Sequence, residues 1–290
     1  MAVSPTVSLR FARIHLDTMS APRFSDAMVL QPGTALPGDA VRSFSANLNE
    51  HWTIGPKVHG GTMVALCANA AHAGYGDGSG STARPVAVSA NFLSAPDPGA
   101  VRLRTVVRKR GRRIGLIDVE LIQGDRTCVY AVVTMGEPEH EAQPMLVNNP
   151  VLDVMGVEPP ADVPAIGPGQ PGAEISNLHR GCDMHAAAKD GAAPVLLTWV
   201  RPKAGPVDEL FALMCGDISL PVPYAVGRRG WAPTVQLTAY QRGRPADGWL
   251  RVLCTTTQIG QDWFDEDHTV VDSAGRIVVQ THQLSLVPGQ

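Results

Sequence analysis

The stretch Leu213-Met214-Cys215-Gly216-Asp217 places a carboxylate at the end of an apolar run. Leu210, Leu213 and Met214 follow the i, i+3, i+4 spacing of a buried helix face, and Asp217 falls at i+7 on the same face. A carboxylate in a core-facing position is costly unless it is paired or used in chemistry. The later part of a helix adds to this cost, because the helix dipole disfavours negative charge there. Asp217 is therefore the first candidate for a catalytic group.

The chain repeats itself, and the repeat gives a second reason to single out Asp217. The segment GGTMVALCAN (60–69) aligns with DELFALMCGD (208–217), so Asn69 corresponds to Asp217. Further along, the offset becomes 150 residues and Val133 corresponds to Gln283. Polar residues on a core face need hydrogen-bond partners, and Asp217 and Gln283 could serve each other through a water. The comparison predicts a polar site in the second copy only.

Each copy is expected to hold one helix followed by antiparallel strands with Gly- or Asp-rich turns. The first helix begins at Gly60, and the second lies near 207–219, because it follows Pro206 and must end before Pro221. The Pro- and Gly-rich composition between the copies is typical of a linker. We expect an N-terminal repeat at 25–136, a linker at 137–190, and a C-terminal repeat with the catalytic residues at 191–290. One irregular α+β domain with chance similarity is the alternative.

His59, Gly60 and Gly61 open the first helix. Two glycines leave the backbone N–H groups open to close approach, and a helix N-terminus favours negative charge. These groups are candidates for an oxyanion hole, with His59 able to contact the substrate. The alternative is a tight turn that needs glycine for packing alone, with a structural or solvated histidine.

Composition excludes several classes of function. A net charge of −3 with 18% charged residues gives no reason to expect a nucleic-acid partner. The basic run RKRGRR (108–113) is interpreted as a solvated hairpin, with a phosphate-binding edge for a coenzyme nucleotide as the alternative. Five single cysteines without a CxxC pair indicate a reduced, cytoplasmic chain, and DEDH (265–268) has no standard metal spacing. We expect no metal, no cofactor, no secretory signal and no membrane span.

The segments HGGTMVALCANAAH, PTVQLTAYQRGRPADGWL and DSAGRIVVQTHQLSLV resemble the double hot-dog acyl-CoA thioesterases, of the acyl-CoA thioesterase II type and its actinobacterial relatives. The resemblance implies an α+β double hot-dog fold. In this fold two repeats each wrap an antiparallel sheet around a long central helix, and the two sheets join edge to edge. It also implies that an Asp, a Gln and a Ser or Thr of the second repeat activate a water. Asp217 and Gln283 match the first two.

The hydroxyl residue does not match directly. Counting without gaps puts its position on Pro233, one residue before Thr234. A β-bulge would bring Thr234 to that position. Thr234 is therefore our candidate and Thr238 the reserve, and an ordinary strand threonine without a catalytic role is equally open.

The implied activity is hydrolysis of acyl-CoA to free acid and CoA, as part of lipid metabolism. Asp217 would be the general base with a pKa raised by burial, Gln283 and Thr234 would orient the water, and the amides near Gly60 and Gly61 would bind the oxyanion. The expected partners are the acyl-CoA substrate and, as an option, further double hot-dog units in a homo-oligomer. Two alternatives are a non-catalytic acyl-CoA-binding or sensing protein and a hot-dog hydratase or dehydratase. The latter requires an Asp–His pair, and no histidine lies within a few residues of Asp217.

Overall fold

The computed structural model describes residues 21–34, 40–76, 82–140, 142–170, 173–189 and 193–289. Residues 1–20, for which we expected no secretory signal, lie outside this part of the chain. None of the helices in the described ranges is long and apolar enough to cross a membrane.

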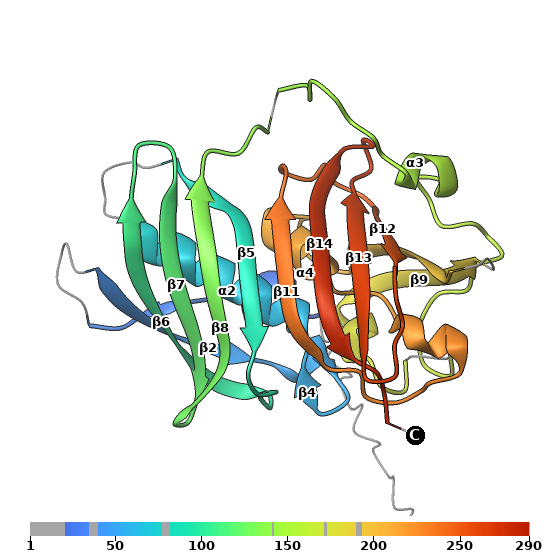
Figure 1. The fold of residues 1–290 in the computed structure, drawn as a ribbon, viewed down its shortest axis with the longest axis horizontal. Coiled ribbons are helices and arrows are strands. Elements are labelled where there is room, and N and C mark those ends of the chain that lie inside the picture. The colour runs from blue at the N-terminus through green and yellow to red at the C-terminus, as the bar shows by residue number, and fades with distance from the viewer. Residues whose placement is uncertain are drawn as a thin grey trace, which may run out of the picture.

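One antiparallel sheet of twelve strands organises the molecule, and its two halves have the same strand order counted from the middle (Figure 1). From the outer edge inward, the first half contains β1 (Gln31–Pro32), β2 (Val41–Leu48), β6 (Gly99–Arg110), β7 (Gly115–Gln123), β8 (Arg126–Gly136) and β5 (Arg84–Phe92). From the middle outward, the second half contains β11 (Thr234–Gln241), β14 (Ile277–Leu286), β13 (Trp263–Val271), β12 (Leu250–Thr255), β10 (Val195–Pro202) and β9 (Cys182–Lys189). The internal repeat of the sequence is thus a repeat of strand order.

The two halves join where β5 pairs with β11. Ala90 lies opposite Leu237 and Val88 opposite Ala239, all four buried. Alternate residues of a strand point to opposite faces, so these four lie on the face that the helices cover. This confirms the expected edge-to-edge joining, which removes two exposed sheet edges.

Two helices lie behind the sheet in Figure 1, one for each half, and they differ in length. Helix α2 (Gly60–Tyr75) has 16 residues, whereas α4 (Glu209–Cys215) has seven. Asp208 caps the start of α4 by accepting a hydrogen bond from the Phe211 amide at 2.8 Å, and Gly216 ends it. The expectation of a second long helix over 207–219 is therefore wrong, and Asp217 lies in the turn after α4 rather than within it.

Both helices share one hydrophobic core, which is continuous across the two halves. Small segments complete the chain around it: α1 (Phe24–Ala27), η1 (Glu50–Trp52), β3 (Thr53–Ile54), β4 (Lys57–Val58), η2 (Asn177–Arg180) and η3 (Val222–Val226). Phe24 of α1 packs edge-to-face on Phe211 of α4, with ring centroids 5.6 Å apart. The N-terminal segment therefore packs on the helix of the second half.

The segment between the two halves passes over one end of the sheet to the far edge of the second half (Figure 1). Its short helix α3 (Val151–Val154) begins with Val151, which packs with Met155 against Trp199 and Trp249. Strand β9 lies within the range 137–190 that we expected to be a linker, and it pairs with β10. The second half thus recruits residues upstream of 191, and the division of the chain into three segments stays a prediction.

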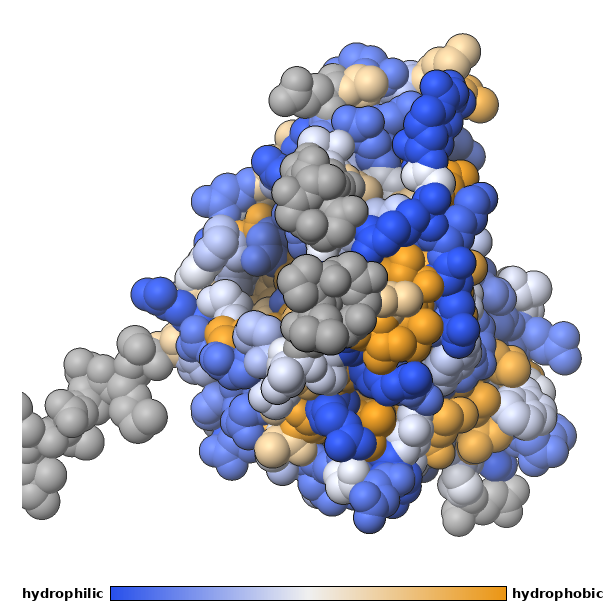
Figure 2. All heavy atoms as spheres, turned by 90° about the vertical axis from the view of Figure 1, so that its left-hand side faces the viewer, coloured by the Kyte–Doolittle hydropathy of each residue, from blue (hydrophilic) through white to orange (hydrophobic). Residues whose placement is uncertain are grey.

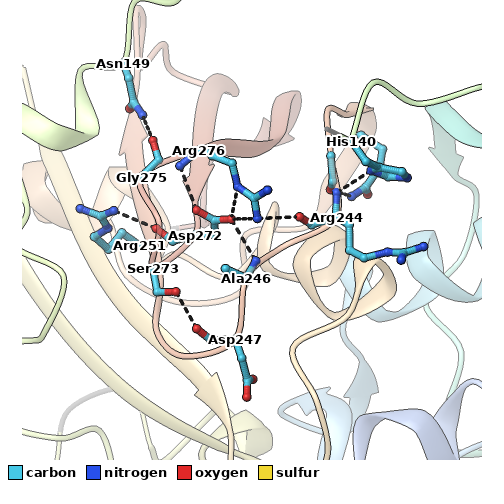
Figure 3. Close-up of polar contacts among 12 residues, drawn as sticks. His140, Asn149, Arg244, Ala246, Asp247, Arg251, Asp272, Ser273, Gly275 and Arg276 are labelled. Carbon is cyan, nitrogen blue, oxygen red and sulfur yellow. Dashed lines mark hydrogen bonds and ion pairs between the residues drawn. The ribbon is translucent and has the colours of Figure 1, made fainter. Parts of the chain in front are cut away.

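A buried carboxylate holds together the turns at this end of the second half (Figure 3). Asp272 is fully buried, accepts hydrogen bonds from the amides of Ala246 and Arg276, and forms an ion pair of 2.7 Å with the Arg276 guanidinium. Its carbonyl accepts from the buried Arg251 at 2.8 Å. The connecting segment is tied to the same turns, because Asn149 donates to the Gly275 carbonyl. The DSAGR turn is therefore held by charge-assisted hydrogen bonds.

Replacing Asp272 with alanine should lower the free energy of unfolding by about 2–4 kcal/mol, because the amides of Ala246 and Arg276 lose their acceptor and the guanidinium groups of Arg276 and Arg251 lose a negative charge. Urea unfolding measures the change. The control is Asp247→Ala, which removes an exposed carboxylate from the neighbouring turn and should alter stability by less than about 0.5 kcal/mol. Equal effects of the two substitutions would contradict the role given to Asp272.

Candidate active site

Asp217 of the second half lies against the N-terminus of α2 from the first half. The His59 ring is 2.7 Å from the Asp217 carbonyl oxygen and 3.5 Å from its carboxylate, both measured from Nε2. Thr62 lies 3.4 Å from the other ring nitrogen of His59. Nε2–H therefore donates to the Asp217 carbonyl, and Nδ1 lies within hydrogen-bonding distance of the Thr62 hydroxyl. The positive end of the α2 dipole favours a carboxylate here.

Glycines make this close approach possible. A Cβ atom on Gly60 would lie 2.6 Å from the Asp217 carboxylate, and one on Gly61 would collide with the Met214 carbonyl. The sequence left two readings open for these glycines, a packing turn or open amides. The structure shows that both positions must be glycine for the chain to pack here. It also engages the Gly61 amide, which donates a hydrogen bond to the Asp217 carboxylate.

Burial raises the pKa of the Asp217 carboxyl group above its usual value, as we expected. The side chain is 10% exposed. Three smaller effects oppose the shift by stabilising the charged form: the nearby His59, the Gly61 amide and the Gln283 side chain. A buried carboxylate with a raised pKa and few partners is suited to accept a proton.

Gln283 comes to the same place from β14. It is 3% exposed, and its neighbours on the adjoining strands are Leu237 of β11 and Glu266 of β13. The amide is 2.5 Å from the Glu266 carboxylate, measured from Nε2 to Oε2. Its Oε1 atom is buried and has no hydrogen-bond partner among the described residues. The predicted pair of Asp217 and Gln283 is thus brought together on the inner face.

The two candidate threonines lie on opposite faces of β11. A register shift between Thr234 and Gln236 sets Thr234 opposite Ser285, a buried residue on the same face as Gln283. This register shift lies where a β-bulge would bring Thr234 to the hydroxyl position. Thr238 instead lies opposite the exposed His282. Because of this register shift, Thr234 lies on the same face of the sheet as Gln283, and Thr238 lies on the opposite face.

Sequence reasoning missed two inward-facing residues of β13. We treated DEDH (265–268) only as a failed metal motif, yet Glu266 and His268 are 2% and 1% exposed. The internal repeat could have revealed these two residues. Glu266 pairs with Gln283 at the position where Ile117 pairs with Val133 in the first half. The polar replacement at Gln283 is therefore accompanied by a polar replacement on the next strand.

Cys254, Glu266 and His268 have metal-binding atoms within 4.8 Å of one another. Their hydrogen bonds do not fit a metal site. Glu266 accepts from the Val222 amide at 2.8 Å, and His268 lies 2.8 Å from the Ser219 hydroxyl and 3.2 Å from that of Thr281. Burial lowers the His268 pKa to about 3 and raises the Cys254 pKa well above its usual value, so the ring is neutral and the thiol stays protonated. The structure therefore uses this cluster as a hydrogen-bonded interior.

The counterpart of Asp217 in the first half has another environment. Asn69 donates to the Met28 carbonyl at 2.7 Å. A cavity of about 180 Å³ lies beside it, lined also by Asp208 and Glu209 at the start of α4 and by Pro138 and His140 of the connecting segment. This cavity lies at the position in the first half that corresponds to the Asp217 site in the second half.

The basic run RKRGRR lies at the other end of α2 from His59. Arg110 donates to the Tyr75 carbonyl at 2.6 Å and stacks over the Tyr75 ring, and Arg108 pairs with Asp118. These contacts favour the hairpin interpretation of this run. Figure 2 shows this side of the molecule as mostly hydrophilic, with hydrophobic side chains visible between charged ones.

The raised pKa of Asp217 predicts a pH-dependent effect on stability. A carboxyl group with a raised folded-state pKa contributes stability below its unfolded pKa and loses that contribution as the pH rises through the folded pKa. Asp217→Asn, which stays neutral, should melt at a higher temperature than the unmodified chain at pH 7. The difference should shrink toward about pH 4. Thermal unfolding across this range tests it, with the exposed Asp125→Asn as control. Lower stability of Asp217→Asn at pH 7 would contradict the burial argument.

Two family descriptions match the chain. The acyl-CoA thioesterase N-terminal domain matches residues 48–136, and the acyl-CoA thioesterase C-terminal domain matches residues 158–287. An uncharacterised protein of Mycobacterium tuberculosis is 58% identical over 287 residues, which cover 92% of this chain and 99% of that protein.

Solved structures give the same fold. A candidate thioesterase II from Thermobifida fusca has a TM-score of 0.77 at 22% identity, and a hot-dog protein of unknown function from Alicyclobacillus acidocaldarius has 0.74 at 18%. The acyl-CoA thioesterase II TesB2 from Mycobacterium marinum has 0.67 at 14%. Each match covers 92% of this chain and 98% of the other. These similarities establish a hot-dog fold, and with the two domain matches they show that the chain belongs to the acyl-CoA thioesterase family.

Proposed function

We propose that this protein hydrolyses acyl-CoA thioesters to the free acid and CoA, with Asp217 as the general base. The observation that supports this most is the position of the Asp217 carboxylate. It is buried between the N-terminus of α2 and Gln283, and burial raises its pKa. Such a group is basic enough to accept a proton from water and is held at the positive end of a helix.

The proposed reaction needs only protein groups and water. Asp217 takes a proton from the water as the oxygen attacks the thioester carbonyl carbon. The carbon–sulfur bond then breaks, and the proton passes from Asp217 to the departing thiolate. The products are a carboxylic acid and the thiol of CoA, so atoms and charges balance. A general base of this kind contributes about 10²–10⁴-fold.

Gln283 and Thr234 are proposed to orient the water. Gln283 lies beside Asp217 and lowers the Asp217 pKa through a hydrogen bond, so its amide is within reach of the same space. Thr234 shares this face because of the bulge. His59, Gly60 and Gly61 remain the proposed substrate-contacting and oxyanion group. The Gly61 amide that now binds Asp217 would then be shared between carboxylate and oxyanion.

Acyl-CoA is the proposed substrate class because both matched domains are named for it. A cytoplasmic location, a part in lipid metabolism and assembly into a homo-oligomer stay predictions.

One observation favours a second candidate, a hot-dog dehydratase or hydratase. We argued against it because no histidine lies near Asp217 in the sequence, yet the fold brings His59 within 3.5 Å of the Asp217 carboxylate. A dehydratase domain of PpsC from M. tuberculosis shares the fold at 13% identity. Gln283 and the raised pKa of Asp217 favour hydrolysis. Assays with enoyl-CoA substrates separate the two activities, because release of free thiol reports hydrolysis and loss of enoyl absorbance reports hydration.

Asp217→Asn should lower kcat for acyl-CoA hydrolysis by at least about 10²-fold, because the amide cannot accept the proton. Release of free CoA from acyl-CoA substrates of several chain lengths measures this. The matched control is Asn69→Ala at the repeat-related position, which should leave kcat near that of the unmodified chain. Binding of acyl-CoA without turnover would favour the sensing alternative, and loss of activity in Asn69→Ala would refute a single active half.

Thr234→Val and Thr238→Val form a matched pair, because the two residues lie on opposite faces of one strand. Thr234→Val should lower kcat by about 10-fold or more if its hydroxyl orients the water, and Thr238→Val should change kcat by less than about 2-fold. Steady-state kinetics with one acyl-CoA decide this. A larger loss in Thr238→Val would show that the hydroxyl assignment is wrong.

A further inference from the structure

Glu266 is a buried carboxyl group that the reaction above does not use, and it touches Gln283. Its side chain is held at both oxygens. Oε1 accepts a hydrogen bond from the Val222 amide at 2.8 Å, and Oε2 lies 2.5 Å from the terminal amide of Gln283. Because the Val222 amide can only donate, it fixes Oε1 as an acceptor. Oε2 is therefore the oxygen that can carry a proton.

The contact between Glu266 and Gln283 has the length of an O–H···O bond. At 2.5 Å it is too short for an ordinary N–H donor and lies at the short end of the range for a hydroxyl donor that faces an oxygen. The oxygen and nitrogen of a glutamine amide are assigned from the hydrogen-bond network, because their shapes are nearly the same. As assigned, Oε1 of Gln283 is buried without a partner in the described part of the chain. Exchanging the two ends gives the amide oxygen the Glu266 proton and places the NH₂ group where Oε1 now lies without a partner.

We propose that Glu266 is a positioning residue that acts as a neutral carboxylic acid: it donates a hydrogen bond to the Gln283 carbonyl and so keeps the Gln283 NH₂ group free to orient the attacking water beside Asp217. This rests on the proposed hydrolysis. The chain of donors runs from the Glu266 hydroxyl through the Gln283 amide to the water that Asp217 is proposed to activate. An ionised Glu266 could only accept, so it would hold the NH₂ group and leave the Gln283 carbonyl oxygen to face the water.

The surroundings of Glu266 favour the neutral form. Burial raises its pKa to about 8, and the negative charges of Asp217 and Asp265 act in the same direction, whereas the hydrogen bonds of the Val222 amide and Gln283 lower the pKa by less. Cys254 and His268 are the other titratable groups that face it, and neither supplies a positive charge near neutral pH, since the thiol is neutral and the ring pKa lies near 3. A carboxylic acid kept neutral at pH 7 can serve as a hydrogen-bond donor.

The first half of the chain lacks both members of this pair. Ile117 stands at the position of Glu266 and lies opposite Val133, which stands at the position of Gln283. The two polar residues therefore occur together on neighbouring strands of one half and are both apolar in the other. This is the pattern expected if Glu266 serves Gln283, and it supplies the design of a test.

Two substitutions separate the states of Glu266. In Glu266→Gln the Val222 amide again binds the carbonyl oxygen, so the new NH₂ group must face Gln283 and mimics the acid at every pH. In Glu266→Ile the residue found in the first half removes the donor. The control is Glu120→Gln on β7 of the first half, where the half-buried carboxylate pairs with Arg104.

We expect Glu266→Ile to lower kcat by at least about 10-fold at pH 7, with a smaller change in KM, and Glu266→Gln to recover most of that loss. In the unmodified chain kcat should fall as the pH rises through about 8, where Glu266 loses its proton. This alkaline fall should be absent in Glu266→Gln and unchanged in Glu120→Gln. A purely structural role would not alter the pH profile in this way.

Glu266→Gln as inactive as Glu266→Ile, or with the alkaline fall intact, would overturn the proposal. If Asp217→Asn and the unmodified chain were equally inactive on every acyl-CoA, the proposed function itself would fail. In that case the protonation of Glu266 can still be tested by infrared difference spectra of the whole protein. The carbonyl-stretch band of a protonated carboxyl group should be present at pH 7, absent in Glu266→Gln and retained in Glu120→Gln. Its absence from the unmodified chain would refute the assignment.

Discussion

The site depends on one contact between the two halves, in which the Asp217 carboxylate is buried against the start of α2. Neither half could form it alone, because the carboxylate comes from the turn after α4 and the helix N-terminus from the other repeat. The contact needs β5 paired with β11 to set the halves side by side, and it needs Gly60 and Gly61 because a Cβ atom there would meet the Asp217 turn. Burial then raises the pKa of this carboxyl group, and the helix dipole and the Gly61 amide limit the cost of its charge.

The duplicated scaffold shows how a polar site is built from an apolar core. On the inner face of the first half the paired strands β7 and β8 carry apolar side chains. At the same register positions the second half has side chains that hydrogen-bond with one another or with nearby backbone. The replaced residues are Ile117, Val119, Ala131 and Val133, and the replacing ones are Glu266, His268, Thr281 and Gln283. Buried polar groups are tolerated only when they are satisfied as a set, so these changes depend on one another.

Two carboxyl groups with raised pKa values lie on either side of one glutamine amide. Asp217 is opposed in its shift by His59 and the Gly61 amide, whereas Glu266 has two acidic neighbours and lies deeper. In the proposed mechanism these environments give the two groups different roles, with Asp217 as the base and Glu266 as the protonated donor. This is how neighbouring carboxyl groups come to serve as base and as hydrogen-bond donor. Gln283 links the two, because an amide both donates and accepts.

The sequence alone predicted the repeat and the polar positions Asp217 and Gln283, because periodicity and internal alignment report which face a residue occupies. For Thr234 it offered only a β-bulge as the way to bring the hydroxyl to the position that the family resemblance implies. It overestimated α4, since apolar spacing continues through Gly216 although the helix ends there. The sequence analysis did not pair His59 with Asp217, because the two residues lie far apart in the sequence. It considered Glu266 only as part of the DEDH motif. Only the tertiary structure decided these points. Proximity across a pseudo-twofold arrangement, and the partner that a buried side chain finds on the next strand, depend on how distant segments pack together, which no local pattern contains.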